Sequence, residues 1–244
     1  MIKAITFDFW STLYISRPVD MAERRRFLQR AIEIRNGHQV AEVALAEAVD
    51  VARDAWNRAW WEEHRTMGAR EWISIVLQAL QIQLAEDHLS EIERALEEKL
   101  LANLPTLVAE AGAVLSELAQ DYRLAIISDT GLSPGRVLRQ ILDQDAVSTY
   151  FTHFTFSDEI GCSKPHANAF FSTLEALEAQ PHEAVHIGDL LRTDIAGAKG
   201  VGMRAVQYVG VNHDSAQIAV VPDAIIESHS QLSPLLQAWN ESVG

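Results

Sequence analysis

From residue 106 onward, short apolar segments alternate with longer segments whose apolar residues recur every three or four positions. The short segments have the composition of strands buried on both faces, and the longer ones have the periodicity of helices. The predicted strands are 123–127, 153–156, 184–187 and 204–208. The predicted helices are 107–119, 134–142, 167–178, 193–200 and 231–239. This alternation predicts an α/β fold with a parallel sheet that is covered by helices on both sides.

The segment between residues 16 and 104 follows a different pattern. It is charged and amphipathic, and it predicts helices at 19–35, 40–65, 69–84 and 86–102, separated by Asn36-Gly37 and Met67-Gly68 and followed by Pro105. An earlier apolar run, IKAITF at residues 2–7, has the character of the later strands. Because that first strand is expected to join the later sheet, we interpret the helical segment as an insertion that forms an antiparallel bundle.

Polar residues follow several of the predicted strands directly. Asp8 follows the first run, Ser128 follows 123–127, and Asp189 follows 184–187. Ligands of open α/β sheets bind at the carboxyl ends of the strands, so we expect these side chains to meet in one crevice. Taken one at a time, the same residues also fit structural roles: aspartates and serines cap turns and helices, and Lys164 fits an exposed lysine.

Four motifs occur in order along the chain. They are DFWSTL at 8–13, IISDTG at 126–131, GCSKPHANAF at 161–170 and HIGDLLRTDIAGAKGVG at 186–202. Together they resemble the four motifs of the haloacid dehalogenase (HAD) superfamily of hydrolases. The resemblance covers residues 1–15 and about 105–225, and the helical segment is similar to the family's cap in length and position. It implies a HAD-like doubly wound parallel-sheet core, residues 1–15 and 105–244, with an inserted α-helical bundle cap, residues 16–104.

The resemblance also implies catalytic roles for individual residues. Asp8 is similar to the nucleophile, and Thr12 to the hydroxyl that positions it. Ser128 and Lys164 are similar to the groups that bind the phosphate or the covalent intermediate. Backbone amides at Asp129 and the residues that follow it are also expected to bind the substrate anion.

A magnesium site follows from the same resemblance. Asp189 is similar to a Mg²⁺ ligand, Asp8 and the backbone carbonyl of Trp10 are expected to join it, and Asp194 is expected to support the metal or its water shell. A physical argument points the same way. Two carboxylates in a small crevice raise each other's pKa unless a cation lies between them, and Mg²⁺ prefers oxygen ligands.

Two residues depart from the phosphatase pattern. Trp10 stands where phosphatases of the family carry the aspartate that acts as general acid and base, and Ser11 stands where a glycine is usual. We expect the Trp10 indole either to contact the substrate or to pack against the cap. The first interpretation is a Mg²⁺-dependent phosphatase that acts on a small phosphorylated metabolite through an aspartyl intermediate. The alternatives are a hydrolase similar to 2-haloacid dehalogenases, which need no proton for the leaving halide, and a catalytically weak HAD-fold binding module.

The helical segment contains a cluster of tryptophans, Trp56, Trp60, Trp61 and Trp72. We expect this cluster to form the core of the bundle or a dimer face rather than a pocket, because each ring buries a large area. Arg58 and Arg70 are candidates for binding a substrate anion. His64, His166 and His186 lack the spacing of metal ligands and are interpreted as structural.

Composition excludes several classes of protein. The formal net charge of −14 disfavours nucleic acid and anionic membranes as partners, and 48% hydrophobic residues suffice for a sizeable core. No apolar run reaches the length of a membrane span, and residues 1–7 read as a strand rather than as an export signal. The single cysteine, Cys162, cannot form an intramolecular disulfide. We therefore expect a cytoplasmic monomer or homodimer that binds a small anionic substrate.

Overall fold

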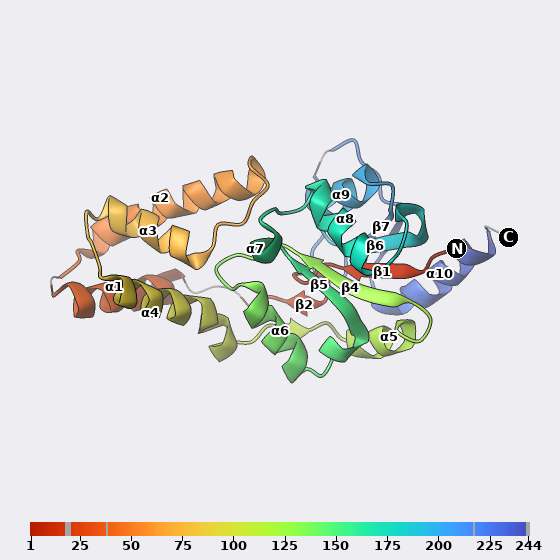
Figure 1. Cartoon of the computed structure of the whole chain (residues 1–244), viewed down its shortest axis with the longest axis horizontal. Coiled ribbons are helices and arrows are strands. Elements are labelled where there is room, and N and C mark those ends of the chain that lie inside the picture. The colour runs from red at the N-terminus through yellow and green to blue at the C-terminus, as the bar shows by residue number, and fades with distance from the viewer. Residues whose placement is uncertain (18–20, 38, 217, 243–244) are drawn as a thin grey trace.

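The computed structural model describes residues 1–17, 21–37, 39–216 and 218–242. Six parallel strands form one sheet in the order β5-β4-β1-β6-β7-β8 (Figure 1). They are β1 (Ala4–Phe7), β4 (Arg123–Ser128), β5 (Phe151–Phe156), β6 (Ala184–Gly188), β7 (Arg204–Tyr208) and β8 (Ala224–Ile226). The first strand therefore lies in the middle of the sheet, between β4 and β6, which come much later in the chain.

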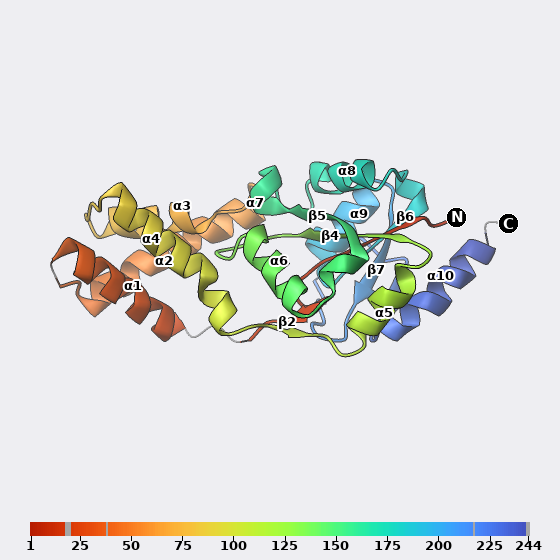
Figure 2. The same ribbon diagram turned by 60° about the horizontal axis from the view of Figure 1, so that its bottom comes forward.

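Helices cover both faces of this sheet, which confirms the doubly wound arrangement (Figure 2). One face packs against α5 (Ala111–Leu118), α6 (Gly135–Gln144) and α10 (Leu232–Glu241). The opposite face packs against α8 (Ala167–Ala176) and α9 (Ala196–Gly200). Because apolar side chains point into a core on each side, the strands read as almost continuous apolar runs. A one-turn helix, α7 (Ser157–Ile160), follows β5.

The helical insertion is joined to the sheet through a small antiparallel ribbon. Its strands are β2 (Tyr14–Ile15) and β3 (Thr106–Leu107), and Tyr14 pairs with Leu107. Between them lie α1 (Met21–Asn36), α2 (Glu42–Trp61), α3 (Ala69–Ala79), α4 (Glu86–Glu97) and the 3₁₀ turn η1 (Glu98–Ala102). These helices enclose a hydrophobic cluster of their own, and Figure 1 shows them at the end of the molecule opposite both termini.

Some boundaries differ from the predicted ones. The helix predicted at 107–119 was wrong at its start, because residues 106–107 form β3 and α5 begins at Ala111. The helix predicted at 40–65 ends at Trp61, and the next residues turn toward the sheet, where Ser163 N donates to His64 O at 2.7 Å. The helix predicted at 69–84 ends at Ala79. The predicted start of the first helix at Val19 lies outside the described residues. Strands β2 and β8 were not predicted.

No helix within the described ranges combines the length and the apolar character that a membrane crossing requires.

His229 gives the core a pH-sensitive element. Its side chain is 1% exposed, and its ring stacks on Tyr208 with 4.4 Å between centroids. Burial lowers the pKa of His229 to about 4. The unfolded chain binds this proton near pH 6.5, whereas the folded chain does not, so stability is lost as the pH falls from about 6.5 toward 4.

We therefore expect the free energy of unfolding of His229→Phe to change less with pH between pH 7 and pH 4.5. The wild type should lose on the order of 2 kcal/mol more than the variant between pH 7 and pH 4.5. Urea unfolding at a series of pH values measures the difference, with His182→Gln, an exposed histidine, as the control. Parallel curves for the wild type and His229→Phe would contradict this assignment.

Candidate active site

The carboxyl ends of the central strands open into a cavity of about 870 Å³ between the sheet and the helical insertion. Its floor includes Asp8, Asp129, Lys164, Asp189 and Asp194. These residues come from β1, from the loop after β4, from the loop before α8 and from the segment after β6. A parallel sheet places all of these ends at one edge, as predicted for open α/β folds. The volume is in the range typical of small-molecule sites.

Lys164 is the only ammonium in direct contact with this group of acids among the described residues. Its side chain is 2% exposed, and Nζ donates to Asp8 Oδ1 at 2.5 Å and to Asp194 Oδ1 at 2.6 Å. Burial alone lowers the pKa of this amine, but the carboxylates of Asp194 and Asp8 outweigh it and raise the pKa above its usual value. The lysine is therefore charged at neutral pH and joins two carboxylates.

Asp194 is held by donors on all sides. Oδ1 accepts from Lys164 and lies 3.1 Å from His186 Nε2, and Oδ2 accepts from Leu190 N at 3.0 Å and Thr193 Oγ1 at 3.2 Å. Burial alone raises the pKa of the Asp194 carboxyl. Lys164 and the hydrogen bond with His186 have the larger, opposite effect, so this pKa lies below its usual value. Asp194 is thus a fixed anion that orients Lys164.

The backbone beside Asp194 leaves no room for another side chain. A Cβ at Gly188 would lie 2.3 Å from Asp194 Cγ, so a glycine is needed at that position. His186, which was interpreted as structural, lies behind Asp194 with Nδ1 2.8 Å from Thr6 Oγ1. Because Nε2 faces the Asp194 carboxylate, the neutral ring carries its proton on Nε2 and donates a hydrogen bond to that carboxylate. Nδ1 then accepts a hydrogen bond from the Thr6 hydroxyl. The histidine therefore connects Asp194 to the interior of the sheet.

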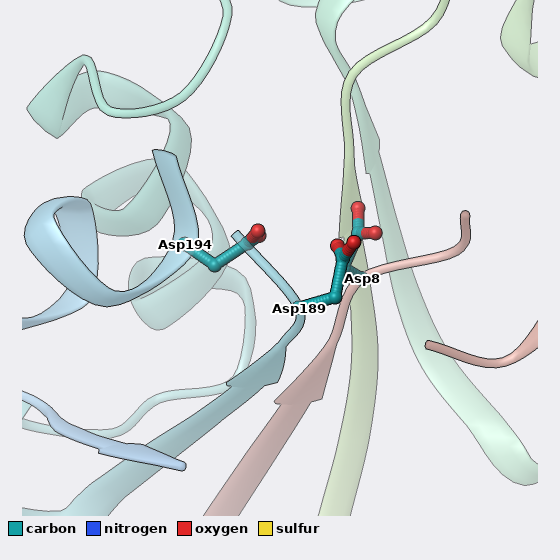
Figure 3. A group of neighbouring side chains, drawn as sticks. All are labelled: Asp8, Asp189 and Asp194. Atoms are coloured by element: carbon teal, nitrogen blue, oxygen red, sulfur yellow. The ribbon is translucent and has the colours of Figure 1, made fainter. Parts of the chain in front are cut away.

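Asp8 and Asp189 lie side by side, and Asp194 points toward them (Figure 3). One carboxylate oxygen from each of the three falls within 4.8 Å of the others. Burial raises the pKa of Asp8 well above its usual value, against the opposing effect of Lys164. Burial and the charge of Asp194 raise the pKa of Asp189 to about 7. Both acids would therefore be ionised together at neutral pH only with added positive charge nearby.

The donor set in this cluster fits a magnesium ion. Mg²⁺ is commonly bound by one or two carboxylates together with phosphate and water oxygens. Asp194 is saturated with hydrogen bonds, whereas Asp8 and Asp189 each accept one side-chain hydrogen bond within the described part of the chain, the latter from Asn212 Nδ2 at 2.7 Å. Asp8 and Asp189 therefore have the oxygens available for direct ligation, and Asp194 lies behind them.

The turn after Asp8 presents Trp10 to the cavity. Ser11 adopts a left-handed conformation with φ of 55°, which costs a residue with a side chain roughly 1–2 kcal/mol. The turn is closed by Ser11 N donating to Tyr14 O and Tyr14 N donating to Phe9 O, both at 2.8 Å. The Trp10 ring packs edge-on against Phe9, with 4.8 Å between centroids, and also borders the cavity.

Two of the predicted residues lie behind the cavity wall. Thr12 is fully buried in the turn after Asp8, and its hydroxyl oxygen Oγ1 has no hydrogen-bond partner among the described residues. Ser128 is also buried and donates to the carbonyl oxygen of Asp129 at 3.3 Å, so its hydroxyl does not border the cavity in this conformation.

Asp129 connects the insertion to the site. Its Oδ1 accepts from Lys164 N at 2.8 Å, and its Oδ2 accepts from Trp60 Nε1, on α2, at 2.9 Å. Burial raises the pKa of this carboxyl. A second contact joins the same parts of the molecule, because the Arg192 guanidinium lies 3.6 Å from the centroid of the Trp61 ring. The α2 helix therefore touches Arg192 and also Asp129, which accepts a hydrogen bond from the backbone of Lys164.

The tryptophan cluster was predicted to form a bundle core or a dimer face rather than a pocket. Trp72 does lie in the hydrophobic core of the insertion, and Trp56 packs against that core. The expectation that the cluster forms no pocket was wrong, because Trp56, Trp60 and Trp72 also border the cavity. Neither Arg58 nor Arg70 is among the cavity residues, and Arg70 is ion-paired with Glu86 and Glu93.

Several other residues of the cavity were not predicted from the sequence. They include Arg17, Arg24, Arg53, Lys99 and Asn212. The spacing of Val49, Arg53, Trp56 and Trp60 along one face of α2 was a signal that these side chains share a surface.

Comparison with known proteins places this site in a family. The sequence model described as haloacid dehalogenase-like hydrolase matches residues 2–202. Haloacid dehalogenase-like hydrolase domain-containing protein 3 of Xenopus laevis is 29% identical over 177 residues, 70% of each chain. Ribulose-1,5-bisphosphate 5-phosphatase of Halopiger xanaduensis is 28% identical over 210 residues, 85% of each chain. The crystal structure of 2-haloacid dehalogenase from Pseudomonas syringae is 24% identical, has a TM-score of 0.69, and covers 98% of this chain and 100% of that one. With the family match spanning most of the sheet and the whole of the acidic cluster, the chain belongs to the haloacid dehalogenase-like hydrolases.

Proposed function

We propose that this hydrolase is a Mg²⁺-dependent phosphatase that acts on a small phosphorylated metabolite. The observation that carries the proposal is the pair of buried carboxylates, Asp8 and Asp189, whose raised pKa values indicate a site built to hold a cation. A bound magnesium ion would neutralise this pair and the charge of a phosphoryl group. The phosphatase name of the relative from Halopiger xanaduensis supports the same reaction class.

The residues of the site have separate tasks in this reaction. Lys164 holds Asp8 Oδ1, which leaves Oδ2 to attack phosphorus. A bond then forms between Asp8 and phosphorus, the bond to the leaving oxygen breaks, and water later cleaves the aspartyl phosphate to free phosphate and restore the carboxylate. Lys164, which borders the cavity, would stabilise charge on the phosphoryl oxygens, and the buried hydroxyl of Thr12 would help to position Asp8.

Among the residues that the structure describes, no side chain near Asp8 is arranged to protonate the leaving group. The Trp10 indole has one weak donor and is not an acid at neutral pH. Asp129, another carboxyl group on the cavity wall, uses both of its oxygens as acceptors from Lys164 N and Trp60 Nε1. This arrangement favours substrates whose leaving groups depart without assistance.

A second candidate is the 2-haloacid dehalogenase reaction, in which Asp8 attacks carbon and halide departs without a proton. Trp10 on the cavity wall is the observation that favours it. Asp189 weighs against it, because an attack on carbon by one carboxylate gives no role to a second buried carboxylate with a raised pKa.

The first test is Asp8→Asn. The amide is nearly isosteric but is not a nucleophile, so turnover of the best substrate should fall by at least about 10³-fold. The fold should persist, because Lys164 keeps its contact with Asp194. Phosphate release and circular dichroism measure the two effects. Rates within a factor of two of the wild type would remove Asp8 from the mechanism.

The second test concerns the metal. Activity should require Mg²⁺ and be lost in excess EDTA. Asp189→Ala should lose activity in the same way. The control variant Asp143→Ala, at an exposed position on α6, should keep it. Mg²⁺ should also raise the melting temperature of the wild type more than that of Asp189→Ala, since binding adds RT ln(1 + [L]/Kd) of stability. Chloride release from 2-chloropropionate at full rate in EDTA would instead establish the dehalogenase reaction.

The third test concerns Trp10. Without a general acid, which contributes about 10²–10⁴-fold, rates should rise steeply as the pKa of the leaving group falls, so aryl and acyl phosphates should react far faster than alkyl phosphates. Trp10→Asp should restore part of the alkyl activity. The loss of the large ring is expected to cost several kcal/mol of stability, on the order of 3–5 kcal/mol. A flat leaving-group series in the wild type, with no relative gain for alkyl phosphates in a folded variant, would show that another residue supplies the proton.

A further inference from the structure

The two sides of the cavity carry opposite charge. The wall formed by the sheet contributes Asp8, Asp129, Asp189 and Asp194 against Lys164. The wall formed by the insertion and its connection contributes four cations, Arg17, Arg24, Arg53 and Lys99, against Glu23. Such an excess of cations on one wall stands out in a chain with 34 acidic and 20 basic residues. An anionic group far from Asp8 would therefore meet complementary charge.

Three of these four cations already have partners. Arg53 is paired with Asp50 at 2.8 Å, Lys99 is paired with Glu23 at 2.5 Å, and Arg17 donates to Asn103 Oδ1 at 3.3 Å. Arg53 and Lys99 are thus paired with carboxylates, whereas Arg17 contacts a neutral amide oxygen. All three contribute to the field of the cavity.

Arg24 differs from the other three. Its side chain is half-buried on the cavity wall at the start of α1, and its Nε is buried with no hydrogen-bond partner among the described residues. Burial lowers the pKa of its guanidinium, and no carboxylate among the described residues offsets that effect. A guanidinium has five donors in a planar fork, which suits a carboxylate or phosphate group, and leaving the buried Nε without an acceptor is unfavourable. An anion would supply that acceptor.

We infer that Arg24 binds a second anionic group of the substrate, a carboxylate or a second phosphate, while the reacting phosphoryl group lies at Asp8. The lining of the same cavity includes the apolar side chains of Trp56, Trp72 and Leu96, which would cover a carbon skeleton. This inference rests on the proposed phosphatase activity and narrows it to monoesters with an anion at each end. Substrate selection is thereby assigned to the insertion and the chemistry to the sheet.

The test compares matched substrates with Mg²⁺ present. 3-Phosphoglycerate differs from glycerol 3-phosphate by a carboxylate, and ribulose 1,5-bisphosphate differs from ribulose 5-phosphate by a phosphate. In at least one pair, the wild type should show kcat/KM at least about tenfold higher for the doubly anionic member, and the pair that does so identifies the second anion. Arg24→Gln should reduce that ratio to within about twofold, mainly through KM, and Arg24→Lys should restore part of it.

The control is Arg30→Gln, which removes an exposed arginine from the same helix outside the cavity and should leave the ratio unchanged. The inference is overturned if the wild type does not discriminate within either pair, or if Arg24→Gln lowers both members of a pair equally while remaining folded.

A binding measurement separates this inference from the proposed function. Calorimetry on Asp8→Asn with both pairs should show tighter binding of the doubly anionic member in at least one pair, and Asp8→Asn combined with Arg24→Gln should lose the difference. If the wild type releases phosphate from none of the four substrates, the proposed phosphatase activity on these compounds is contradicted. The calorimetric comparison would still decide for or against the role of Arg24.

Discussion

The ammonium of Lys164 is shared directly by two buried acids, Asp8 and Asp194, and the arrangement of the site depends on it. It lies between Asp8 and Asp194 and is almost completely buried. Removing one partner of such a buried cluster leaves uncompensated charge, which costs several kcal/mol. Asp194 is in turn fixed by His186 and by the backbone N–H of Leu190, so the position of the lysine is determined by the sheet rather than by a flexible loop. Asp8 therefore has a defined orientation before any ligand arrives.

Asp129 connects the segment that carries Lys164 to the helical insertion. It accepts hydrogen bonds from the backbone of Lys164 on one oxygen and from Trp60 of α2 on the other. Arg192, close to Asp194 in sequence, covers the ring of Trp61. Asp129 is thus shared between α2 and the backbone of Lys164. One carboxylate links the position of the insertion to the segment that carries the buried lysine.

The sequence predicted the sheet and the members of the acidic cluster because both follow from short-range patterns. Buried parallel strands read as apolar runs, and residues directly after them reach the same edge of the sheet. The edge strand β8 and the ribbon of β2 and β3 are only two or three residues long, too short for a pattern to emerge. The role of Trp60 and the position of Arg24 depend on how the insertion lies against the sheet. Spacing along a helix identifies a face, but it does not identify what that face meets.

The central position of β1 has a consequence for how the chain acquires its structure during synthesis. Ala4 pairs with Arg123 on one side and with Ala184 on the other. At 5–20 residues per second, the first strand waits on the order of ten seconds for any neighbour in the sheet. The insertion, which has its own core and mostly local contacts, can fold during that time. Asp8 is the first residue of the site to leave the ribosome, yet it meets Asp189 only after β6 has emerged. The catalytic centre is therefore among the last parts of the molecule to form.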